Sequence, residues 1–115
     1  MKFGIFYDLV INDRKTQTSR IPAEKWLEWY DKEEYYIRGN EIRVDPPNPT
    51  LPSNHFIRLT ERPFKTKLAT VATLPEHYVR EGCSSSDEFK VAWLKLYGTF
   101  DPDLDVVVLR FIRVR

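Results

Sequence analysis

The pattern of apolar and polar residues is clearest near the C-terminal end of the chain, where apolar side chains recur every three or four residues. This spacing is typical of one face of an amphipathic helix, made here by Phe89, Ala92, Trp93, Leu96 and Tyr97. Ser85 and Glu88 stand three residues apart, as in a capping box, where each side chain satisfies a free backbone amide. Gly98 can adopt the left-handed conformation that ends a helix. The sequence therefore predicts a helix between Ser85 and Gly98.

Alternation of apolar and polar residues, together with β-branched side chains, predicts several short strands. We expect them at residues 15–21, 41–44, 55–60, 64–73 and 105–115. In the fourth segment every second residue from Phe64 to Ala72 shares one face. In the last segment Val106 to Leu109 is apolar on both faces, which indicates a central or barrel strand.

Further helices are predicted before and between these strands. The spacing of Phe6, Leu9 and Val10 predicts about two helical turns, and Pro22 opens a short helix. Trp26, Trp29 and Tyr30 fall on one face of that helix, which we expect to pack against the sheet.

Two further segments complete the prediction. Thr73 and Glu76 repeat the capping spacing and predict a helix that ends at Gly82. Residues 45–54 carry four prolines, which lack the amide needed for a sheet, and are expected to form a loop.

The order of elements predicts an α+β fold. Regular alternation of strand and helix is missing, which favours a curled mixed sheet over a doubly wound parallel one. We expect a small mixed β-barrel of about five to six strands with flanking short helices. At 115 residues the chain is expected to form a single domain over residues 1–115.

Composition and charge narrow the function. The chain has 18 Lys and Arg against 17 Asp and Glu, so a net charge of +1 gives no field to hold nucleic acid non-specifically. Cys83 is the only cysteine, and with His55 and His77 it matches no zinc spacing, so we expect no structural metal and no cofactor. The apolar start of the chain is too short for a signal peptide or a membrane span, which predicts a cytoplasmic protein without membrane contact.

The densest polar chemistry lies between Arg14 and Arg20. Here the chain resembles the ASCH domain family over nearly its whole length. The resemblance rests on the order of Ile11, Lys15, Thr16, Thr18, Arg20, Gly39, Glu81, Gly82, Phe89, Trp93, Tyr97, Gly98 and a closing apolar strand. The chain departs from the family pattern at Asp13, where Gly is usual, and at Asn40, where Asp is common.

The resemblance implies a β-barrel similar to the PUA fold, with a cleft beside the barrel and a role in binding RNA. Some small members are amidohydrolases that remove the acetyl group from N4-acetylcytidine, and others have been linked to RNA cleavage. The amidohydrolase site of Lys, Thr and Glu corresponds here to Lys15, Thr18 and Glu81. We add Arg14, Thr16, Arg20 and Arg38 as candidates for binding RNA or a modified nucleoside.

The three candidate catalytic residues are chemically suited to amide hydrolysis. A threonine hydroxyl becomes nucleophilic when a base takes its proton, and a desolvated lysine can serve as that base. Glu81 could orient the amine or pass a proton to the leaving nitrogen. On a regular strand Lys15 and Thr18 would face opposite sides, so both reach one pocket only if Lys15 precedes the strand.

Other interpretations stay open at the level of sequence. Taken singly, each of these residues is more often a strand or surface residue than a site residue. A non-catalytic RNA-binding or ribonuclease-like module could use a basic rim of Lys65, Lys67, Arg110, Arg113 and Arg115. A protein-interaction domain is a third alternative, and the sequence leaves the oligomeric state open.

Overall fold

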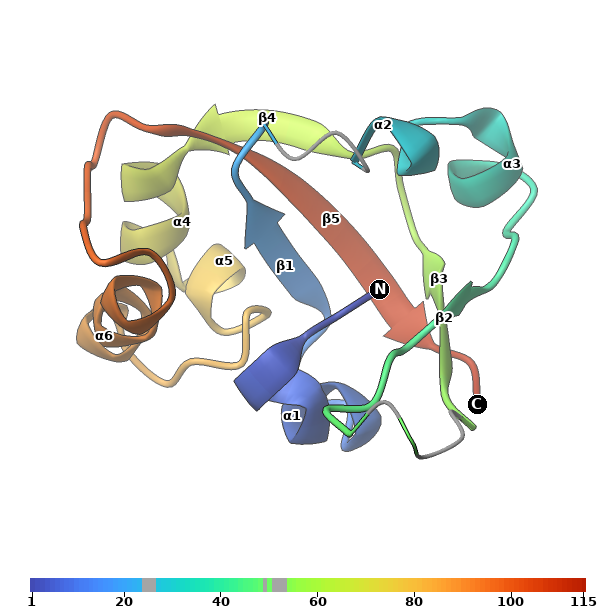
Figure 1. Cartoon of the computed structure of the whole chain (residues 1–115). Helices are drawn as coiled ribbons and strands as arrows, with labels where there is room; N and C mark the ends of the chain where they lie inside the picture. Colours follow the sequence, from blue (N-terminus) through green and yellow to red (C-terminus); the bar gives the residue numbers. More distant parts are fainter. Residues whose placement is uncertain (24–26, 49, 51–53) are drawn as a thin grey trace.

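The computed structural model describes residues 1–23, 27–48, 50 and 54–115. The helices are η1 (Gly4–Phe6), α1 (Tyr7–Ile11), α2 (Leu27–Tyr30), α3 (Glu33–Tyr36), α4 (Leu68–Thr73), α5 (Pro75–Tyr78) and α6 (Ser86–Tyr97). The strands are β1 (Gln17–Arg20), β2 (Ile42–Arg43), β3 (Phe56–Leu59), β4 (Phe64–Lys67) and β5 (Asp105–Arg113). The fold is thus α+β, with short elements apart from α6 and β5 (Figure 1).

The sheet is built around β5, the last and longest strand. β1 pairs antiparallel with β5, with Gln17 opposite Arg110 and Ser19 opposite Val108. β4 pairs antiparallel with the first half of β5 and β3 with its end, while β2 adds to β3. β5 is therefore a central strand, as predicted from the segment Val106 to Leu109, which is apolar on both faces.

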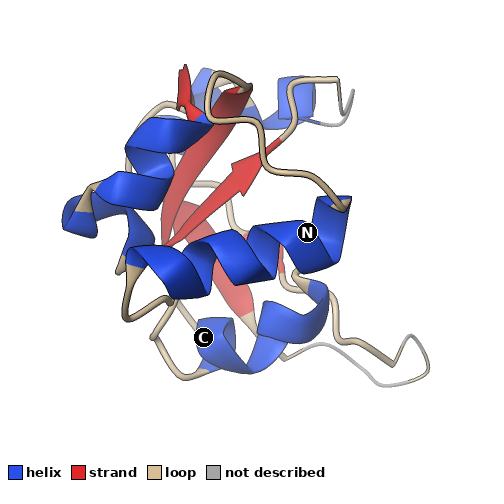
Figure 2. Cartoon of the chain, turned by 90° about the vertical axis from the view of Figure 1, so that its left-hand side faces the viewer, coloured by secondary structure: helices blue, strands red, loops and turns tan. Residues whose placement is uncertain are grey.

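Two cores lie on the two faces of β5, because alternate side chains of a strand point to opposite sides. Val106 and Val108 pack with the apolar faces of α4 and α6. Leu109 and Phe111 pack with the N-terminal segment, β2 and β3. Figure 2, which views the molecule from the side where α4, α5 and α6 lie, shows these helices in front of the strands.

The helix predicted from the apolar stripe near the C-terminal end is confirmed. α6 begins after Ser85, whose hydroxyl accepts a hydrogen bond from the Glu88 amide at 3.1 Å. It ends at Gly98, whose φ of 78° is left-handed. Phe89 and Trp93 are its buried residues.

The long strand predicted over residues 64–73 is wrong in its second half. Strand pairing ends where Lys67 meets Asp105, the first residue of β5, so no partner strand continues beyond it. The chain turns instead into α4, where Leu68, Val71 and Ala72 share a helical face and are fully buried. The capping box predicted at Thr73 is also wrong, because Thr73 lies inside α4 and its hydroxyl donates to the Ala69 carbonyl oxygen.

The predicted barrel is correct only in its coarser features. Five strands and short helices are present, but over the described residues hydrogen bonding follows an open path, β1-β5-β3-β2, with β4 also on β5. Closure of the sheet is therefore not part of the described structure. Residues 45–54 contain no strand at their described positions, apart from an isolated parallel bridge between Asp45 and Lys2.

The helix after Pro22 matches its prediction only in part: Tyr30 is half-buried against the core, as predicted. Trp29 is 64% exposed, so it does not pack against the sheet. Leu27 provides the buried contact of α2 instead. Trp26, predicted on the same face, lies outside the described residues.

Candidate functional site

A cavity of about 270 Å³ lies between the N-terminal segment, β1 and α6. One part of its wall is polar and is formed by Lys2, Lys15, Thr18, Ser19, Arg20, Glu81 and Cys83. The other part is mainly apolar and is formed by Phe3, Gly4, Phe6, Phe89, Ala92, Trp93, Leu96 and Tyr97. Small-molecule sites typically combine an apolar lining with a few convergent polar groups.

Lys15 and Glu81 form a buried ion pair at this cavity. Each residue is 4% exposed, and the Lys15 Nζ lies 3.3 Å from Glu81 Oε1. The same ammonium donates to the Glu81 main-chain oxygen at 3.1 Å and lies 5.0 Å from the centre of the Phe6 ring. Burial of both charges is tolerated because they neutralise each other and share hydrogen bonds.

Local backbone structure explains how Lys15 reaches the cavity. Lys15 precedes β1, which begins at Gln17, so it lies at the junction between helix and strand. Its amide donates to the Leu9 carbonyl oxygen, which anchors it to the end of α1. The structure therefore meets the condition under which Lys15 and Thr18 can line one pocket.

Glu81 is held at the site by the backbone around Gly82. The amides of Thr16 and Gln17 both donate to the Arg80 carbonyl oxygen, which joins this turn to the start of β1. Gly82 has a φ of 94°, and an added Cβ would lie 2.9 Å from Leu9 Cδ1. Glycine is favoured here by the left-handed backbone conformation, and a larger residue would also displace the Leu9 side chain.

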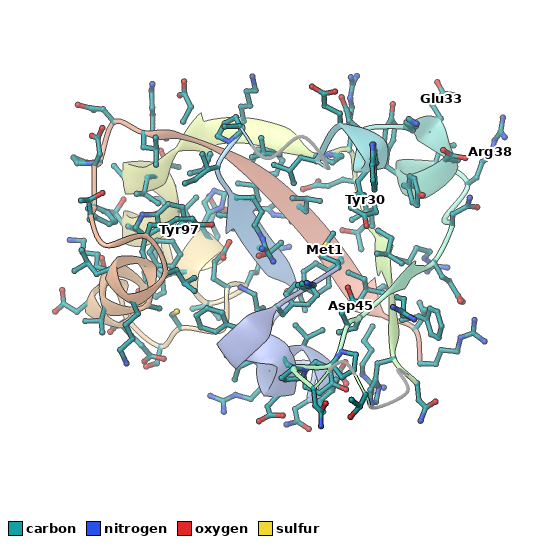
Figure 3. All side chains as sticks on the ribbon, viewed as in Figure 1. Met1, Tyr30, Glu33, Arg38, Asp45 and Tyr97 are labelled. Carbon is teal, nitrogen blue, oxygen red and sulfur yellow. The ribbon has the colours of Figure 1, made fainter. Side chains whose placement is uncertain are left out.

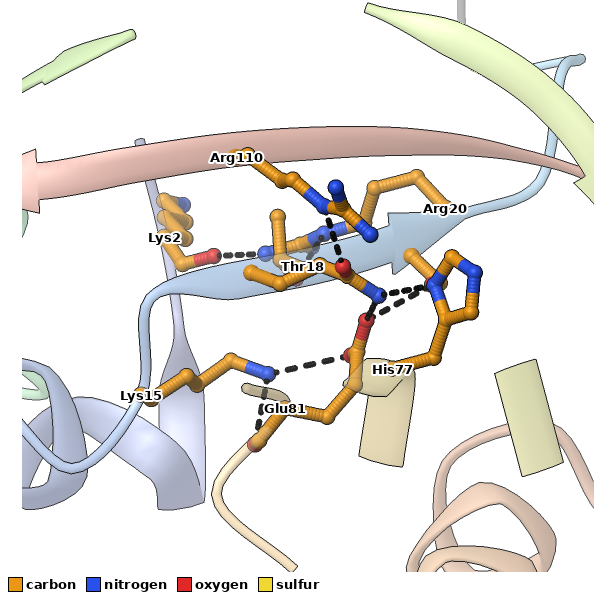
Figure 4. A network of polar contacts seen from close by, with 9 residues as sticks. Lys2, Lys15, Thr18, Arg20, His77, Glu81 and Arg110 are labelled. Carbon is orange, nitrogen blue, oxygen red and sulfur yellow. Dashed lines mark hydrogen bonds and ion pairs between the residues drawn. The ribbon is translucent and has the colours of Figure 1, made fainter. Parts of the chain in front are cut away.

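The second oxygen of Glu81 is also fully engaged. Glu81 Oε2 accepts from Gln17 Nε2 and from Ser19 Oγ, each at 2.8 Å. Gln17 and Ser19 are two apart on β1 and therefore point to the same face of the strand. Figure 4 shows this carboxylate between Lys15 and β1.

The amide of Gln17 joins Glu81 to two further residues. Arg110 Nε donates to Gln17 Oε1 at 2.9 Å, and Gln17 Nε2 lies 3.2 Å from His77 Nδ1 (Figure 4). Gln17 is fully buried and His77 nearly so. Burial of its ring, and then the Arg110 charge, lower the pKa of His77.

Thr18 lies on the opposite face of β1 and makes different contacts. Its hydroxyl oxygen accepts from Arg20 Nε at 3.2 Å, and Arg20 also donates to the Lys2 carbonyl oxygen at 2.6 Å. The guanidinium group lies 5.7 Å from the Phe3 ring centre. Arg20 thus ties the N-terminal wall of the cavity to the strand that carries Thr18.

The environment changes the acidity of two groups in the wall. Burial lowers the pKa of Lys15, partly offset by the Glu81 charge, so its unprotonated amine is more accessible than that of a surface lysine. Burial raises the pKa of Cys83 to about 11. Cys83 is therefore a thiol at neutral pH, in line with the structural role that its sequence context favours.

Four of the residues selected from the sequence lie together. Lys15, Thr18, Arg20 and Glu81 all line the cavity. A catalytic role of Lys15, Thr18 and Glu81 stays a prediction.

The other three selected residues do not line this cavity. Arg14 is exposed, and Thr16 contributes backbone hydrogen bonds to Arg80 and Phe111. Arg38 is exposed after α3, far from Tyr97 in the cavity wall (Figure 3). Spacing along the chain could not show this, because Arg38 is carried to the other end of the sheet by α2 and α3.

Sequence reasoning missed the residues that hold Glu81 in place: Gln17, Ser19, His77 and Arg110. One signal was available, since Gln17 and Ser19 stand two residues apart in a segment predicted to be a strand and therefore share a face. Buried polar residues at such positions need partners, which the sequence alone does not identify.

The basic rim proposed from the sequence is largely paired with acids. Arg113 forms an ion pair with Asp13 at 3.0 Å, and Lys67 with Asp105 at 2.8 Å. Further pairs join Arg110 to Glu61 and Arg115 to Glu41. These carboxylates reduce the positive potential that phosphate binding would need.

The described residues contain neither a metal-binding cluster nor a membrane-spanning helix. Its His, Cys, Asp and Glu residues form no group of three or more that could hold a metal ion. Among the described helices, none has the length and apolar character of a membrane span.

Comparison with known proteins gives the class of fold. No protein-family model and no curated protein matches the sequence. The structure is similar to that of an ASCH domain from Lactobacillus crispatus, with a TM-score of 0.56 and 13% identity over 96% of this chain and 70% of that one. It is also similar to protein EF3133 from Enterococcus faecalis, described under the family DUF984, with a TM-score of 0.59 and 17% identity over 96% of this chain and 68% of that one. The chain therefore has an ASCH-like fold.

Proposed function

We propose that this chain binds a small modified nucleoside in the cavity and hydrolyses an N-acyl amide on its base, as in N4-acetylcytidine. The observation that carries the proposal is the buried pair of Lys15 and Glu81 in a cavity whose wall also includes the Thr18 hydroxyl. The ASCH-like fold supports a nucleoside or RNA ligand through the sequence resemblance described above.

The size and lining of the cavity support a ligand of this kind. At about 270 Å³ it is just below the usual range of drug-sized pockets, about 300–1,000 Å³. A nucleoside matches this volume better than an extended oligonucleotide. The aromatic side chains Phe6, Trp93 and Tyr97 offer flat surfaces for a base, while the polar wall offers donors and acceptors.

The reaction can be written with each atom accounted for. The unprotonated Lys15 amine takes the Thr18 hydroxyl proton as the threonine oxygen attacks the amide carbon. The C–N bond then breaks, the proton passes to the leaving nitrogen of the base, and the acyl group remains as an ester on Thr18. Water hydrolyses this ester to release the free acid. Glu81 holds Lys15 in place and stabilises its ammonium form between these steps.

Turnover of N4-acetylcytidine to cytidine and acetate, followed by chromatography, tests the proposal. We expect turnover by the wild-type protein and a loss of about a thousandfold in kcat for Thr18→Val. Thr66→Val on β4 is the matched control, because Thr66 is half-buried on a strand and does not line the cavity, and should keep wild-type kcat. Absence of turnover by the wild type would exclude the hydrolase, and equal rates in both variants would exclude Thr18 as the nucleophile.

The ion pair needs a separate design, because removing one charge leaves the other buried. Lys15→Met alone should destabilise the fold by about 3–5 kcal/mol. The double variant Lys15→Met with Glu81→Gln removes both charges and should be closer to wild type in stability but inactive. A folded and fully active double variant would show that the pair has no catalytic role.

The alternative of RNA binding through a basic rim has less support, because the rim is paired with acids. Titration with single-stranded RNA at two salt concentrations distinguishes binding at the basic rim from binding of a nucleoside in the cavity. Phosphate contacts give a steep loss of affinity with salt, whereas a nucleoside bound in the cavity does not.

A further inference from the structure

We propose that Gln17 is a positioning residue that holds the Glu81 carboxylate in front of Lys15. Gln17 does not belong to the cavity wall, so it would not touch a ligand bound there. Its role as an aid to turnover rests on the proposed function, whereas its effect on Lys15 can be measured without any substrate.

The orientation of the Gln17 side chain is set by Arg110. A guanidinium can only donate, so the Gln17 atom 2.9 Å from Arg110 Nε must be the amide oxygen. The amide NH2 group therefore faces Glu81 and His77. Arg110 lies opposite Gln17 in the β1–β5 register, so the sheet itself places this donor.

Both hydrogens of the Gln17 amide then have acceptors. One is donated to Glu81 Oε2 at 2.8 Å and the other to His77 Nδ1 at 3.2 Å. His77 must accept at Nδ1, so it is neutral with its proton on Nε2, consistent with its lowered pKa. With Ser19 as second donor, Glu81 Oε2 is fixed and Oε1 is left directed at Lys15.

Two substitutions of Gln17 should move the titration of Lys15 in opposite directions. Gln17→Leu removes one of the two donors to Glu81 Oε2, so the carboxylate is held less firmly in front of Lys15 and attracts the ammonium less. Gln17→Glu adds a negative charge beside Glu81 and stabilises the ammonium. The other charged or titratable groups near Lys15 are Arg20 and Cys83, which both substitutions leave in place.

The experiment follows the 13Cε resonance of Lys15 against pH in protein with 13C-labelled lysine, assigned with Lys15→Arg. We expect the midpoint to fall by about 1 pH unit in Gln17→Leu and to rise by about 1 pH unit in Gln17→Glu. Val108→Ala is the control, because it loosens the same pair of strands without removing a contact to Glu81. Its Lys15 midpoint should equal that of the wild type.

Unchanged midpoints in both Gln17 variants would overturn the inference, as would equal shifts in Val108→Ala. If Gln17→Leu does not fold, Gln17→Met replaces it, because methionine keeps the length of the side chain without the donor and should lower the midpoint in the same direction. For turnover, Gln17→Leu should lower kcat about tenfold with little change in KM, as expected for a residue that acts through another. A wild type without turnover would defeat the proposed hydrolase while leaving the Lys15 titration as a valid test of Gln17.

Discussion

At the residue scale, the site is defined by which polar groups are buried and how each is satisfied. Lys15, Gln17 and Glu81 are all less than 5% exposed, and each has hydrogen-bond partners from another segment of the chain. Buried polar groups without partners would cost about 1–3 kcal/mol each. The hydrogen bonds of this network therefore stabilise the fold, and they also influence the pKa of Lys15.

His77 gives a pH dependence with a definite sign. Its pKa is lowered in the folded protein, so between that value and about 6.5 the unfolded chain binds more protons than the folded one. Stability contributed by neutral His77 is present above pH 6.5 and is lost as the pH falls, by at most about 1.4 kcal/mol per pH unit.

Urea unfolding at pH 7.5 and pH 5.5 checks this expectation. His77→Gln keeps an acceptor for Gln17 but cannot gain a proton, so its stability should fall less between the two pH values than that of the wild type. Val79→Ala, an exposed substitution that leaves both histidines in place, is the control and should follow the wild type. An equal decline in His77→Gln and wild type would contradict the assignment of a neutral His77.

At the element scale, α6 combines local signals with a buried face. Ser85 caps its first turn, Gly98 ends it, and Phe89 and Trp93 fill the core and the cavity wall. Because Trp93 and Tyr97 lie in contact, with ring centres 4.3 Å apart, a shift of this helix would alter one side of the cavity.

Removal of the N-cap should lower the stability of the protein measurably. Ser85→Ala loses the acceptor for the Glu88 amide and should cost about 1 kcal/mol in the free energy of unfolding. Ser86→Ala, one residue further inside the helix, is the matched control and should change stability little. Thermal unfolding followed by circular dichroism gives the comparison, and equal losses in the two variants would show that the cap is not stabilising.

At the scale of the whole molecule, β5 joins the two cores and carries β1, β3 and β4. The cavity depends on this arrangement, because β1 is held against β5 while α6 and the N-terminal segment approach it from different parts of the chain. Glu81 and Lys15 are 66 residues apart in sequence and meet only in the assembled fold.

Amide hydrogen exchange should be slowest in β5, because this strand lies at the centre of the fold. Amides of β5 from Val106 to Phe111 should exchange only through global unfolding, because they lie between the two cores in a strand that pairs with β1, β3 and β4. Amides of α2 and α3 should exchange faster, since α2 has one buried residue and α3 none. Measurement by NMR would contradict the assignment if β5 exchanged as fast as these helices.

Features that depend on neighbours along the chain could be predicted before the fold was known. The limits of α6 follow from capping and periodicity, which act over one or two turns, and the central place of β5 follows from its apolar run. The ordered motif also selected Lys15, Thr18, Arg20 and Glu81, and the structure brings these four to one cavity.

The distant partner that each residue meets depends on the assembled fold. The segment after Lys67 became a helix because β5 starts at Asp105 and leaves no strand to pair with. Trp29 is exposed and Arg38 is remote from the cavity because α2 and α3 lie at the other end of the sheet. Hydrogen bonds between side chains depend on positions in space, so the contact of Gln17 with Glu81 is visible only once the chain is folded.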